Sequence, residues 1–428
     1  MTSGAEPDSN IAVVGQGYVG LPLALAAAAS GCAVVGIETD AAKAQRLQAG
    51  TSPTADVADQ ELAAALSEGR YRAESSFDHL KGADITVLCV PTPYRKQAPD
   101  LSHVESAAAE TARRLERGAL VILESTAYPG TTTEVVLPIL EAHSGFTSGT
   151  DFDLAFSPER IDPGNPTFGV RNTPKIVGGI TARSTVRASA FYSRFVDRVV
   201  PVSSPATAEM AKLLENTFRY INIALVNELA IFCRDMSIDV WEVIDAAASK
   251  PFGFMPFYPG PGVGGPCIPI DPMYLSWRVR QFGGSAKFIE LARAINDTMP
   301  LYCASRVQDL LNDRGLALKG SRILIVGVTY KPDVGDIRES PAIPLMSALL
   351  DKGALLSFYD PHVDAIDLPH GRRLFRCELS RSLSEGVDCA VIVTPHTVVD
   401  HEAIAARALV VLDTRRTIRA GGSNVHLL

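Results

Sequence analysis

The sequence predicts an α/β protein in which two doubly wound domains are joined by a central helical segment that contains a long helix. Short apolar runs alternate with helical stretches from residue 11 to about residue 200, and apolar runs recur from residue 321 onward. Between these regions, apolar residues recur at steps of three and four, the period of a helix with one apolar face. We therefore expect three parts, at residues 1–204, 205–300 and 301–428.

The first domain opens with a glycine-rich turn. The apolar run 11–14 precedes Gly15-Gln16-Gly17-Tyr18-Val19-Gly20, which leads into a helical stretch, 21–30, and a second apolar run, 32–37. In such a unit the first glycine allows a tight turn, the second lets a pyrophosphate approach the backbone, and the third lets the helix pack on the sheet. The pyrophosphate would rest on the helix N-terminus. We expect a bound dinucleotide, and the rival interpretation is a turn that binds nothing.

An acidic residue supports the dinucleotide. Glu38 ends the second apolar run, 18 residues after Gly20, close to the position of the acid that bonds a ribose hydroxyl. A carboxylate there repels a 2′-phosphate, so NAD is favoured over NADP. The unit is typical of a Rossmann-like domain.

Polar segments follow three further predicted strands of this domain. Residues 85–90 end at Pro91-Thr92-Pro93, residues 120–124 at Ser125-Thr126, and residues 154–156 at Ser157-Pro158-Glu159-Arg160. Ligands of doubly wound sheets bind beyond the carboxyl ends of the strands. These three segments are therefore candidate parts of a site.

The central segment carries an apolar stripe and a polar pair. The stripe is interpreted as the face of a buried scaffold helix or of a dimer helix; it consists of Ala211, Leu214, Phe218, Ile221, Leu225, Leu229 and Phe232. Lys212 and Asn216 lie four residues apart, so they share a face outside the stripe. We expect this pair to be functional.

A single thiol follows a loop that no regular helix or strand would tolerate. The run 259–272, PGPGVGGPCIPIDP, presents Cys267, with Asp271 four residues later. A thiol gives covalent catalysis only when it is activated and has a carbonyl to attack. The sequence must therefore also account for a carbonyl.

The last part reads as a second Rossmann-like α/β domain. Its strand candidates are residues 321–328, 355–359, 389–393 and 409–412. Only Gly327 follows its first strand, and the glycine triplet is missing. A mononucleotide or a sugar nucleotide is therefore a better candidate ligand than a second dinucleotide.

Composition narrows the class of protein. The 428 residues are 46% hydrophobic and 21% charged, with a net charge of −8. A net negative charge does not favour binding to nucleic acid or to an anionic membrane surface. The first ten residues lack the pattern of a signal peptide. The seven cysteines are scattered without a CxxC pair, so we expect no metal site or disulfide framework and a reduced, cytoplasmic protein.

Seven motifs, taken together and in this order, resemble the UDP-glucose/GDP-mannose dehydrogenase family, the nucleotide-sugar 6-dehydrogenases. They are GQGYVGLPLA, VPTP, ESTAYPGTT, FSPERIDPGN, AEMAKLLENTFRYINIALVNELA, GGPCIPIDP and YKPDVGDIRESP, and they span nearly the whole chain. The forms SPERIDPGN and KPFGFMPFYPGPG look like the branch that acts on UDP-N-acetylhexosamines. A homodimer built on the helix from Met210 to Met236 is a further hypothesis.

The resemblance also supplies the carbonyl. It implies that NAD oxidises the C6 alcohol of a nucleoside-diphosphate hexose to an aldehyde, which Cys267 captures as a thiohemiacetal. A second NAD gives a thioester, and water releases the uronic acid. Lys212 would stabilise the developing alkoxide, helped by Asn216. Glu159 and Asp271 are candidates to position or deprotonate water, and Thr126 would hold the water or the nicotinamide side.

The implied contacts divide into two sets. Those to NAD are Gly15, Gln16, Gly17, Tyr18, Val19, Gly20, Glu38, Lys43, Pro91, Thr92, Ser125, Thr126 and Arg338. Those to the sugar nucleotide are Glu159, Arg160, Lys212, Asn216, Tyr258, Gly260, Gly262, Gly264, Lys331 and Arg415.

Each catalytic assignment has a structural rival. Cys267 is also compatible with a small buried residue, Lys212 with a solvated helix residue, and Asp271 with an N-cap. Glu159 is also compatible with a structural pair with Arg160. The histidines at positions 143, 362, 370 and 396 share no spacing and receive no role.

The chain departs from the family pattern at three positions. Many relatives have a second glutamate where Pro163 stands, relatives of this branch usually have histidine where Pro266 stands, and the ribose acid is more often aspartate than Glu38. Water activation is therefore expected to fall more heavily on Glu159 and Asp271.

Two other functions stay open. One is a two-electron dehydrogenase of the hydroxyacid or 6-phosphogluconate type, which would need no thiol. The other is a non-catalytic nucleotide-sugar binding protein, which would not need Lys212 or Cys267. The sequence does not separate UDP-glucose, UDP-N-acetylhexosamines and dTDP-glucose, nor polysaccharide biosynthesis from natural product glycosylation.

Overall fold

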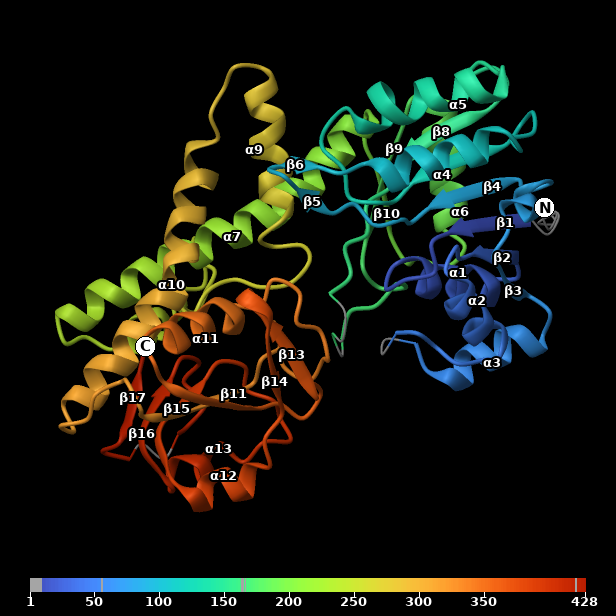
Figure 1. Cartoon of the computed structure of the whole chain (residues 1–428). Coiled ribbons are helices and arrows are strands. Elements are labelled where there is room, and N and C mark those ends of the chain that lie inside the picture. Colours follow the sequence, from blue (N-terminus) through green and yellow to red (C-terminus); the bar gives the residue numbers. More distant parts are fainter. Residues whose placement is uncertain (1–9, 55–56, 163–164, 166, 420–421) are drawn as a thin grey trace. The chain divides into compact units, whose positions relative to one another are not determined.

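The structure, a computed structural model, describes residues 10–54, 57–162, 165, 167–419 and 422–428. Pro163 lies outside these residues. The chain divides into two compact units. Unit 1 runs to Glu215 and includes Met273–Gly284, and unit 2 comprises Asn216–Pro272 and Ser285–Leu428. The predicted fold class is confirmed (Figure 1), and the division into three domains stays a prediction.

Unit 1 is built on an eight-stranded sheet in the order β10-β9-β8-β7-β4-β1-β2-β3. The strands are β1 (Asn10–Val14), β2 (Ala33–Ile37), β3 (Tyr71–Glu74), β4 (Ile85–Leu88), β7 (Leu120–Leu123), β8 (Asp153–Phe156), β9 (Lys175–Gly179) and β10 (Val199–Pro201). All neighbours are parallel except β8 and β9. The chain order reverses between β1 and β4, which is where a doubly wound sheet binds its ligand.

Helices cover both faces of this sheet. They are α1 (Gly20–Ala29), α2 (Ala41–Gln48), α3 (Asp59–Ser67), α4 (Ser102–Ala112), α5 (Leu137–Ser144) and α6 (Ala182–Tyr192). Leu23 of α1 and Tyr192 of α6 belong to one apolar core with the strands. Figure 1 shows α4 and α5 side by side on the other face. A small hairpin, β5 (Tyr94–Arg95) and β6 (Ala98–Pro99), follows β4.

Unit 2 contains a five-stranded parallel sheet in the order β12-β11-β15-β16-β17. The strands are β11 (Arg322–Val326), β12 (Leu355–Tyr359), β15 (Val387–Ile392), β16 (Ala408–Asp413) and β17 (Val425–Leu427), and β13 (Ala365–Leu368) pairs with β14 (Arg372–Phe375) as a hairpin. The helices are α8 (Val240–Ala248), α10 (Lys287–Asn312), α11 (Ala342–Asp351), α12 (Leu379–Glu385) and α13 (His401–Ala405). One core lies under α10 and α11, and a second under α12 and α13.

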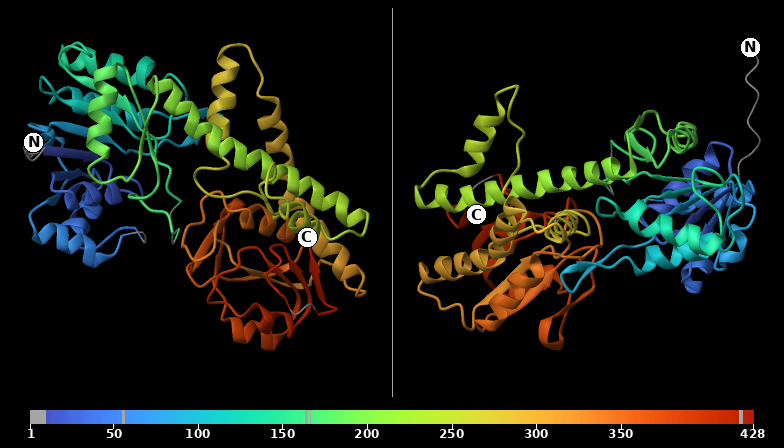
Figure 2. Two further views of the ribbon diagram at one scale, coloured as in Figure 1. Left: turned by 180° about the vertical axis from the view of Figure 1, so that it is seen from behind. Right: turned by 90° about the horizontal axis from the view of Figure 1, so that it is seen from above.

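The long central helix, α7 (Pro205–Asp235), is continuous over 31 residues, and α9 (Asp271–Gln281) follows the glycine-rich loop. Figure 2 shows α7 in green in both views. Its apolar stripe is not buried within this chain: Leu214 is 59% exposed and Phe232 50%. The interpretation as a buried scaffold helix is therefore wrong for these positions, because the buried face of α7 is a different one, which carries both apolar residues such as Leu213 and Val226 and polar ones such as Lys212 and Asn216.

Among the described residues, we find no helix that combines the length and the apolar character needed to cross a membrane.

Candidate active site

The glycine turn of unit 1 has the steric properties that a dinucleotide requires. Gly15 has a φ of +92°, and a Cβ on Gly20 would lie 1.9 Å from the carbonyl oxygen of Gly15. A Cβ on Gly17 would meet nothing within 4 Å. Val19 makes no side-chain cap to α1, so backbone N–H groups at this helix end are available to a phosphate.

Glu38 is held beside the turn. One of its carboxylate oxygens accepts a hydrogen bond from the backbone N–H of Gln16 at 3.3 Å and pairs with Lys43 Nζ at 2.5 Å. Gln16 is itself buried, and its side-chain oxygen accepts a hydrogen bond from Tyr71 at 2.9 Å. The predicted cofactor residues Gln16, Glu38 and Lys43 are thus in direct contact.

The loops after β4 and β7 also meet. The hydroxyl of Ser125 donates to the backbone carbonyl of Leu88 at 3.2 Å, and the hydroxyl of Tyr274 donates to that of Thr92 at 2.5 Å. This places the Pro91-Thr92 and Ser125-Thr126 segments at neighbouring strand ends, beside the turn after β1.

A buried charge network that the sequence interpretation did not include lies at the same sheet edge. Lys175 Nζ pairs with Glu124 and, at 3.2 Å, with Glu159 Oε2, while the Tyr192 hydroxyl donates to Glu124 at 2.9 Å. Burial and the charge of Glu159 raise the pKa of Glu124 to about 7, against the lowering effect of Lys175. The sequence feature that could indicate this network is Lys175, a charged residue at the start of the otherwise apolar strand KIVGG.

The guanidinium of Arg160 does not form an ion pair with the carboxylate of Glu159, so the rival interpretation of Glu159 is wrong in this respect. The Arg160 guanidinium pairs with Glu215 at 2.6 Å and donates to the carbonyl of Pro174 at 2.6 Å. The Glu159 carboxylate instead accepts the backbone N–H of Arg160 and pairs with Lys175.

The polar face of α7 is buried. Lys212 is 7% exposed, so it is not a solvated helix residue, and Asn216 is fully buried. One turn earlier, Glu209 accepts backbone N–H groups of Gly130 and Thr132 at 2.6 and 2.9 Å. Lys212 belongs to unit 1, whereas Asn216 belongs to unit 2.

In unit 2, the loop before Cys267 is fixed by close backbone contacts. Gly265 has a φ of +93°, and a Cβ there would lie 2.9 Å from the ring of Tyr330. Its N–H donates to the carbonyl of Arg338 at 3.0 Å. Cys267 is half-buried, and its carbonyl accepts the N–H of Asp271 at 2.8 Å.

Asp271 is joined to the polar face of α7. Asn216 Nδ2 donates to Asp271 Oδ2 at 2.5 Å, and Asp271 is 3% exposed. Helix α9 begins at Asp271, so this residue is the first of the helix and not a residue preceding it. Unit 2 therefore brings together Asn216, Asp271 and the loop that carries Cys267.

Other predicted residues of the glycine-rich loop contact different parts of unit 2. Gly260 lies against Arg415, because a Cβ on Gly260 would lie 2.3 Å from a guanidinium nitrogen of Arg415. Tyr258 stacks on Trp241, with ring centroids 5.4 Å apart, and donates a hydrogen bond to Asp245 at 2.8 Å. Gly262 packs against Pro341, and Gly264 against Tyr330. The half-buried guanidinium of Arg415 is a group of the kind that binds phosphate.

The Arg338 side chain pairs with Asp336 at 2.5 Å, and its predicted contact with NAD stays a prediction. Near it, the hydroxyl of Thr329 donates to the carbonyl of Lys331 at 3.0 Å. These contacts fix the segment that carries both predicted ligand-binding cations.

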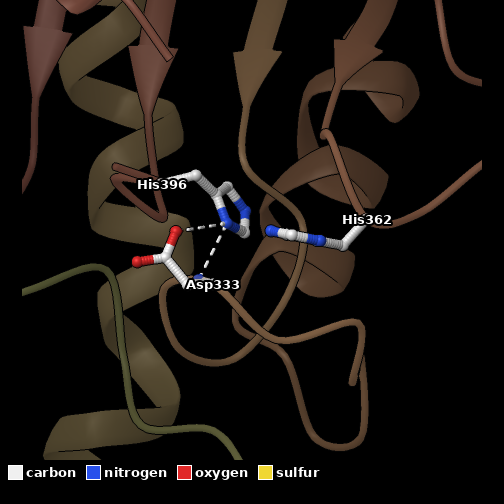
Figure 3. Close-up of side chains that lie close together, drawn as sticks. All are labelled: Asp333, His362 and His396. Carbon is white, nitrogen blue, oxygen red and sulfur yellow. Dashed lines mark hydrogen bonds and ion pairs between the residues drawn. The ribbon is translucent and has the colours of Figure 1, made fainter. Parts of the chain in front are cut away.

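Three side chains of the kind that binds metal ions meet near Lys331 (Figure 3). The candidate ligand atoms of Asp333, His362 and His396 lie within 4.8 Å of one another. His396 Nε2 lies 2.9 Å from the carboxylate of Asp360, and its Nδ1 accepts the backbone N–H of Asp333 at 3.0 Å. Because Nδ1 is used in this way, we interpret the group as an anchor for the loop after β11.

A nucleotide turn, a second α/β domain and a fixed thiol define the class of protein as a dinucleotide-dependent dehydrogenase with a second nucleotide site. Comparisons with known proteins agree. Residues 9–196, 206–298 and 324–420 match, respectively, the NAD binding domain, the central domain and the UDP binding domain of the UDP-glucose/GDP-mannose dehydrogenase family. The chain belongs to this family. It is an oxidoreductase that uses NAD, and its substrate is a nucleotide sugar.

Individual relatives are similar over most of their length. The chain is 34% identical over 415 residues to the UDP-N-acetyl-D-mannosamine dehydrogenase of Pyrococcus horikoshii, with 96% of each chain covered. It is 37% identical over 358 residues to the UDP-N-acetyl-D-glucosamine 6-dehydrogenase of Salmonella typhi, with 83% of each covered. The solved structure of the Pyrococcus horikoshii UDP-D-ManNAc dehydrogenase superposes with a TM-score of 0.89 at 33% identity, with 98% of each chain covered.

Proposed function

We propose that this protein oxidises the C6 hydroxymethyl group of a UDP-N-acetylhexosamine to a carboxylate, in two steps that pass through a covalent bond to Cys267. The observation that carries the proposal is the loop before Cys267, because backbone contacts fix this loop and place the backbone of Cys267 against Asp271, which is hydrogen-bonded to Asn216. A dehydrogenase that stops at the first oxidation needs no nucleophile.

NAD, when bound, accepts one hydride in each of the two oxidations. Lys212 stabilises the negative charge that develops on the C6 oxygen as its proton leaves, and a buried amine on a helix is suited to this because it is desolvated and fixed. Asn216 adds an N–H donor. The role is supported by the burial of both side chains on one face of α7.

The Cys267 thiol loses its proton and the thiolate adds to the aldehyde carbon, while the carbonyl oxygen takes up one proton in exchange and becomes the hydroxyl of a thiohemiacetal. Loss of a hydride and a proton gives the thioester, and water then breaks the carbon–sulfur bond to release the uronate and the thiol. Asp271 accepts the proton of that water. Its burial, its hydrogen bond to Asn216 and its place one turn from Cys267 support this role.

The names of two relatives support the sugar class, since both act on UDP-N-acetylated hexosamines. UDP-glucose and dTDP-glucose are alternative substrates, to be tested beside the UDP-N-acetylhexosamines. Arg415, Tyr258 and Gly260 are proposed to hold the nucleotide, and Glu38 with Lys43 the adenosine ribose of NAD.

We further propose a homodimer. One exposed face of α7 is apolar, with Leu214, Phe218, Leu225, Leu229 and Phe232 each 38% exposed or more. Apolar side chains repeated along one helix face are typical of a surface that a partner covers. The seven cysteines, all within the described residues, form no disulfide bond, which fits a reducing compartment and supports the cytoplasm.

Trapping of the covalent intermediate tests the proposal. Asp271→Asn removes the group that activates water, so a sugar acyl adduct should accumulate on the peptide that contains Cys267 and be visible by mass spectrometry. Cys377→Ala, which alters another half-buried cysteine, is the matched control and should keep the adduct in the Asp271→Asn background. Two NADH per sugar without any adduct in rapid-quench samples would contradict the thioester route.

A further inference from the structure

Lys175 is a buried cation that lies between two carboxylates. Its side chain is 7% exposed, that of Glu124 is fully buried and that of Glu159 is 16% exposed. The ammonium group also lies 5.2 Å from the centre of the Tyr192 ring. An isolated ammonium group is costly to bury, so these partners account for its position.

The sheet topology explains why the cation reaches this edge. Strands β7 and β8 are parallel, whereas β9 runs antiparallel to β8. The first residue of β9, Lys175, therefore lies at the edge where β7 and β8 end, and Glu124 and Glu159 follow those two ends. A fully parallel sheet would place the first residue of β9 at the opposite edge.

Glu159 has hydrogen-bond or ion-pair partners on both carboxylate oxygens. Oε1 accepts the backbone N–H groups of Arg160 and Ile161 at 2.6 and 2.7 Å, and Oε2 pairs with Lys175 at 3.2 Å. Although burial raises the pKa of Glu159, Lys175 and the two N–H groups outweigh it and lower that pKa. A carboxylate held in this way is a weak proton acceptor.

The network contains one more carboxylate than it has cations. Glu124 removes this excess of negative charge by binding a proton, because it is the more deeply buried carboxyl group and its pKa is raised to about 7. Cys89 and Tyr192 also face the network, and burial raises the pKa of each well above its usual value, so both stay neutral. Glu124 is thus the group that exchanges a proton near neutrality.

We infer that Lys175 is a positioning residue, which holds Glu159 ionised and in one orientation at the sheet edge while Glu124 takes up the proton that the network requires. The inference rests on the proposed function for the part that concerns turnover. Its consequence is that Glu159 acts as a fixed negative charge and hydrogen-bond acceptor, whereas Asp271 accepts the proton of water.

The first test needs no substrate. A carboxyl group with a raised folded-state pKa binds a proton that the unfolded chain releases, so stability falls as pH rises from its unfolded pKa through its folded pKa. The contribution of Glu124 is the difference in the pH 5–7 slope of unfolding free energy between the wild type and Glu124→Gln, and it should correspond to about one proton. Other groups with shifted pKa values, such as His401, His426 and Glu209, contribute equally to both proteins. Lys175→Met should change the wild-type slope by about one further proton in the same direction, because Glu159 then also takes up a proton.

Lys175→Met combined with Glu159→Gln should restore the wild-type slope, because Glu124 is then again the one carboxyl group of the network that takes up a proton. Equal slopes in Lys175→Met and the wild type would overturn the inference. If Lys175→Met does not fold, the comparison of Glu124→Gln with the wild type decides, because an unchanged slope there would overturn the assignment of the exchanging proton to Glu124, which the inference requires.

The second test links the network to turnover. The substrate is whichever nucleotide sugar gives activity with the wild type. With it, Lys175→Met should lower kcat at least tenfold with KM changed less than threefold. It should also shift the acid limb of the pH–kcat profile to higher pH. Lys175→Arg should restore most of kcat. Arg187→Met, which removes a cation from the buried Asp153 in the same unit, is the matched control and should not move the pH profile. An unmoved acid limb in Lys175→Met would overturn the inference, whereas absence of wild-type activity with every sugar would overturn the proposed function and leave the stability test valid.

Discussion

Asn216 on α7 donates a hydrogen bond to the buried carboxylate of Asp271 at 2.5 Å. The two residues are 55 positions apart in the chain. On its other side, the Asn216 carbonyl accepts a hydrogen bond from Arg219, which fixes the orientation of the amide. The contact ties the polar face of α7 to the start of α9, next to the loop that carries Cys267.

The Asn216–Asp271 pair should be energetically coupled. Asn216→Ala, Asp271→Ala and the double variant should give a coupling of about 1–3 kcal/mol in the free energy of unfolding, because either single change removes the buried hydrogen bond between the two side chains. Denaturant unfolding measures it. The exposed pair Arg381 and Glu385 is the control, with an expected coupling below about 0.5 kcal/mol. Additive effects at Asn216 and Asp271 would refute the coupling.

Alanine substitutions at Gly20 and at Gly17 should affect different properties of the protein. Gly20→Ala should destabilise unit 1 by about 1–3 kcal/mol, since its Cβ would overlap the carbonyl of Gly15. Gly17→Ala should leave thermal unfolding unchanged, because its Cβ meets nothing, yet weaken NAD binding about tenfold or more by filling the space expected for the pyrophosphate. Unchanged NAD affinity by calorimetry in Gly17→Ala would place the cofactor elsewhere.

Lys212→Met should lower kcat by about two orders of magnitude or more, the scale of losing one stabiliser of a developing oxyanion. Steady-state kinetics with NAD and the preferred sugar measure it. Lys352→Met, which removes a lysine that bonds only a surface glutamine side chain in the described contacts, serves as the control. A change confined to KM would make Lys212 a binding residue instead.

The exposed face of α7 should hold two copies of the chain together. Leu214→Asp combined with Leu229→Asp should convert a particle of twice the chain mass into a monomer, since charge is placed where apolar side chains would be buried. Light scattering at micromolar concentration measures it. Val398→Asp, at an apolar position that is 72% exposed elsewhere in unit 2, should not change the mass. A monomeric wild type would rule out the proposed dimer.

The fold could be predicted because its signals are local. The strand 355–359 was predicted with the bounds that β12 has, and the other strands that bear the site differ from their predictions by only one or two residues at each end. Glu38 was predictable because a fixed spacing links it to the glycine turn. Periodicity also identified α7, but it could not show which face is buried.

The buried network could not be predicted from spacing. Lys175 meets Glu124, 51 residues earlier, only because β9 reverses direction next to β8. Nothing in the residues around Lys175 indicates that reversal. The burial of Glu209, Lys212 and Asn216 likewise depends on the surroundings of α7, since a helix whose exposed face is apolar contradicts the usual pattern of a single chain.

The most direct test of the central claim is the number of NADH molecules formed for each sugar consumed. The panel comprises UDP-N-acetylmannosamine, UDP-N-acetylglucosamine, UDP-glucose and dTDP-glucose, each with the wild type and with Cys267→Ala. We predict about two NADH per sugar and a uronic acid product for the wild type on one UDP-N-acetylhexosamine, and no uronic acid for Cys267→Ala. About one NADH per sugar for the wild type, or sustained uronic acid formation by Cys267→Ala, would contradict the covalent four-electron route.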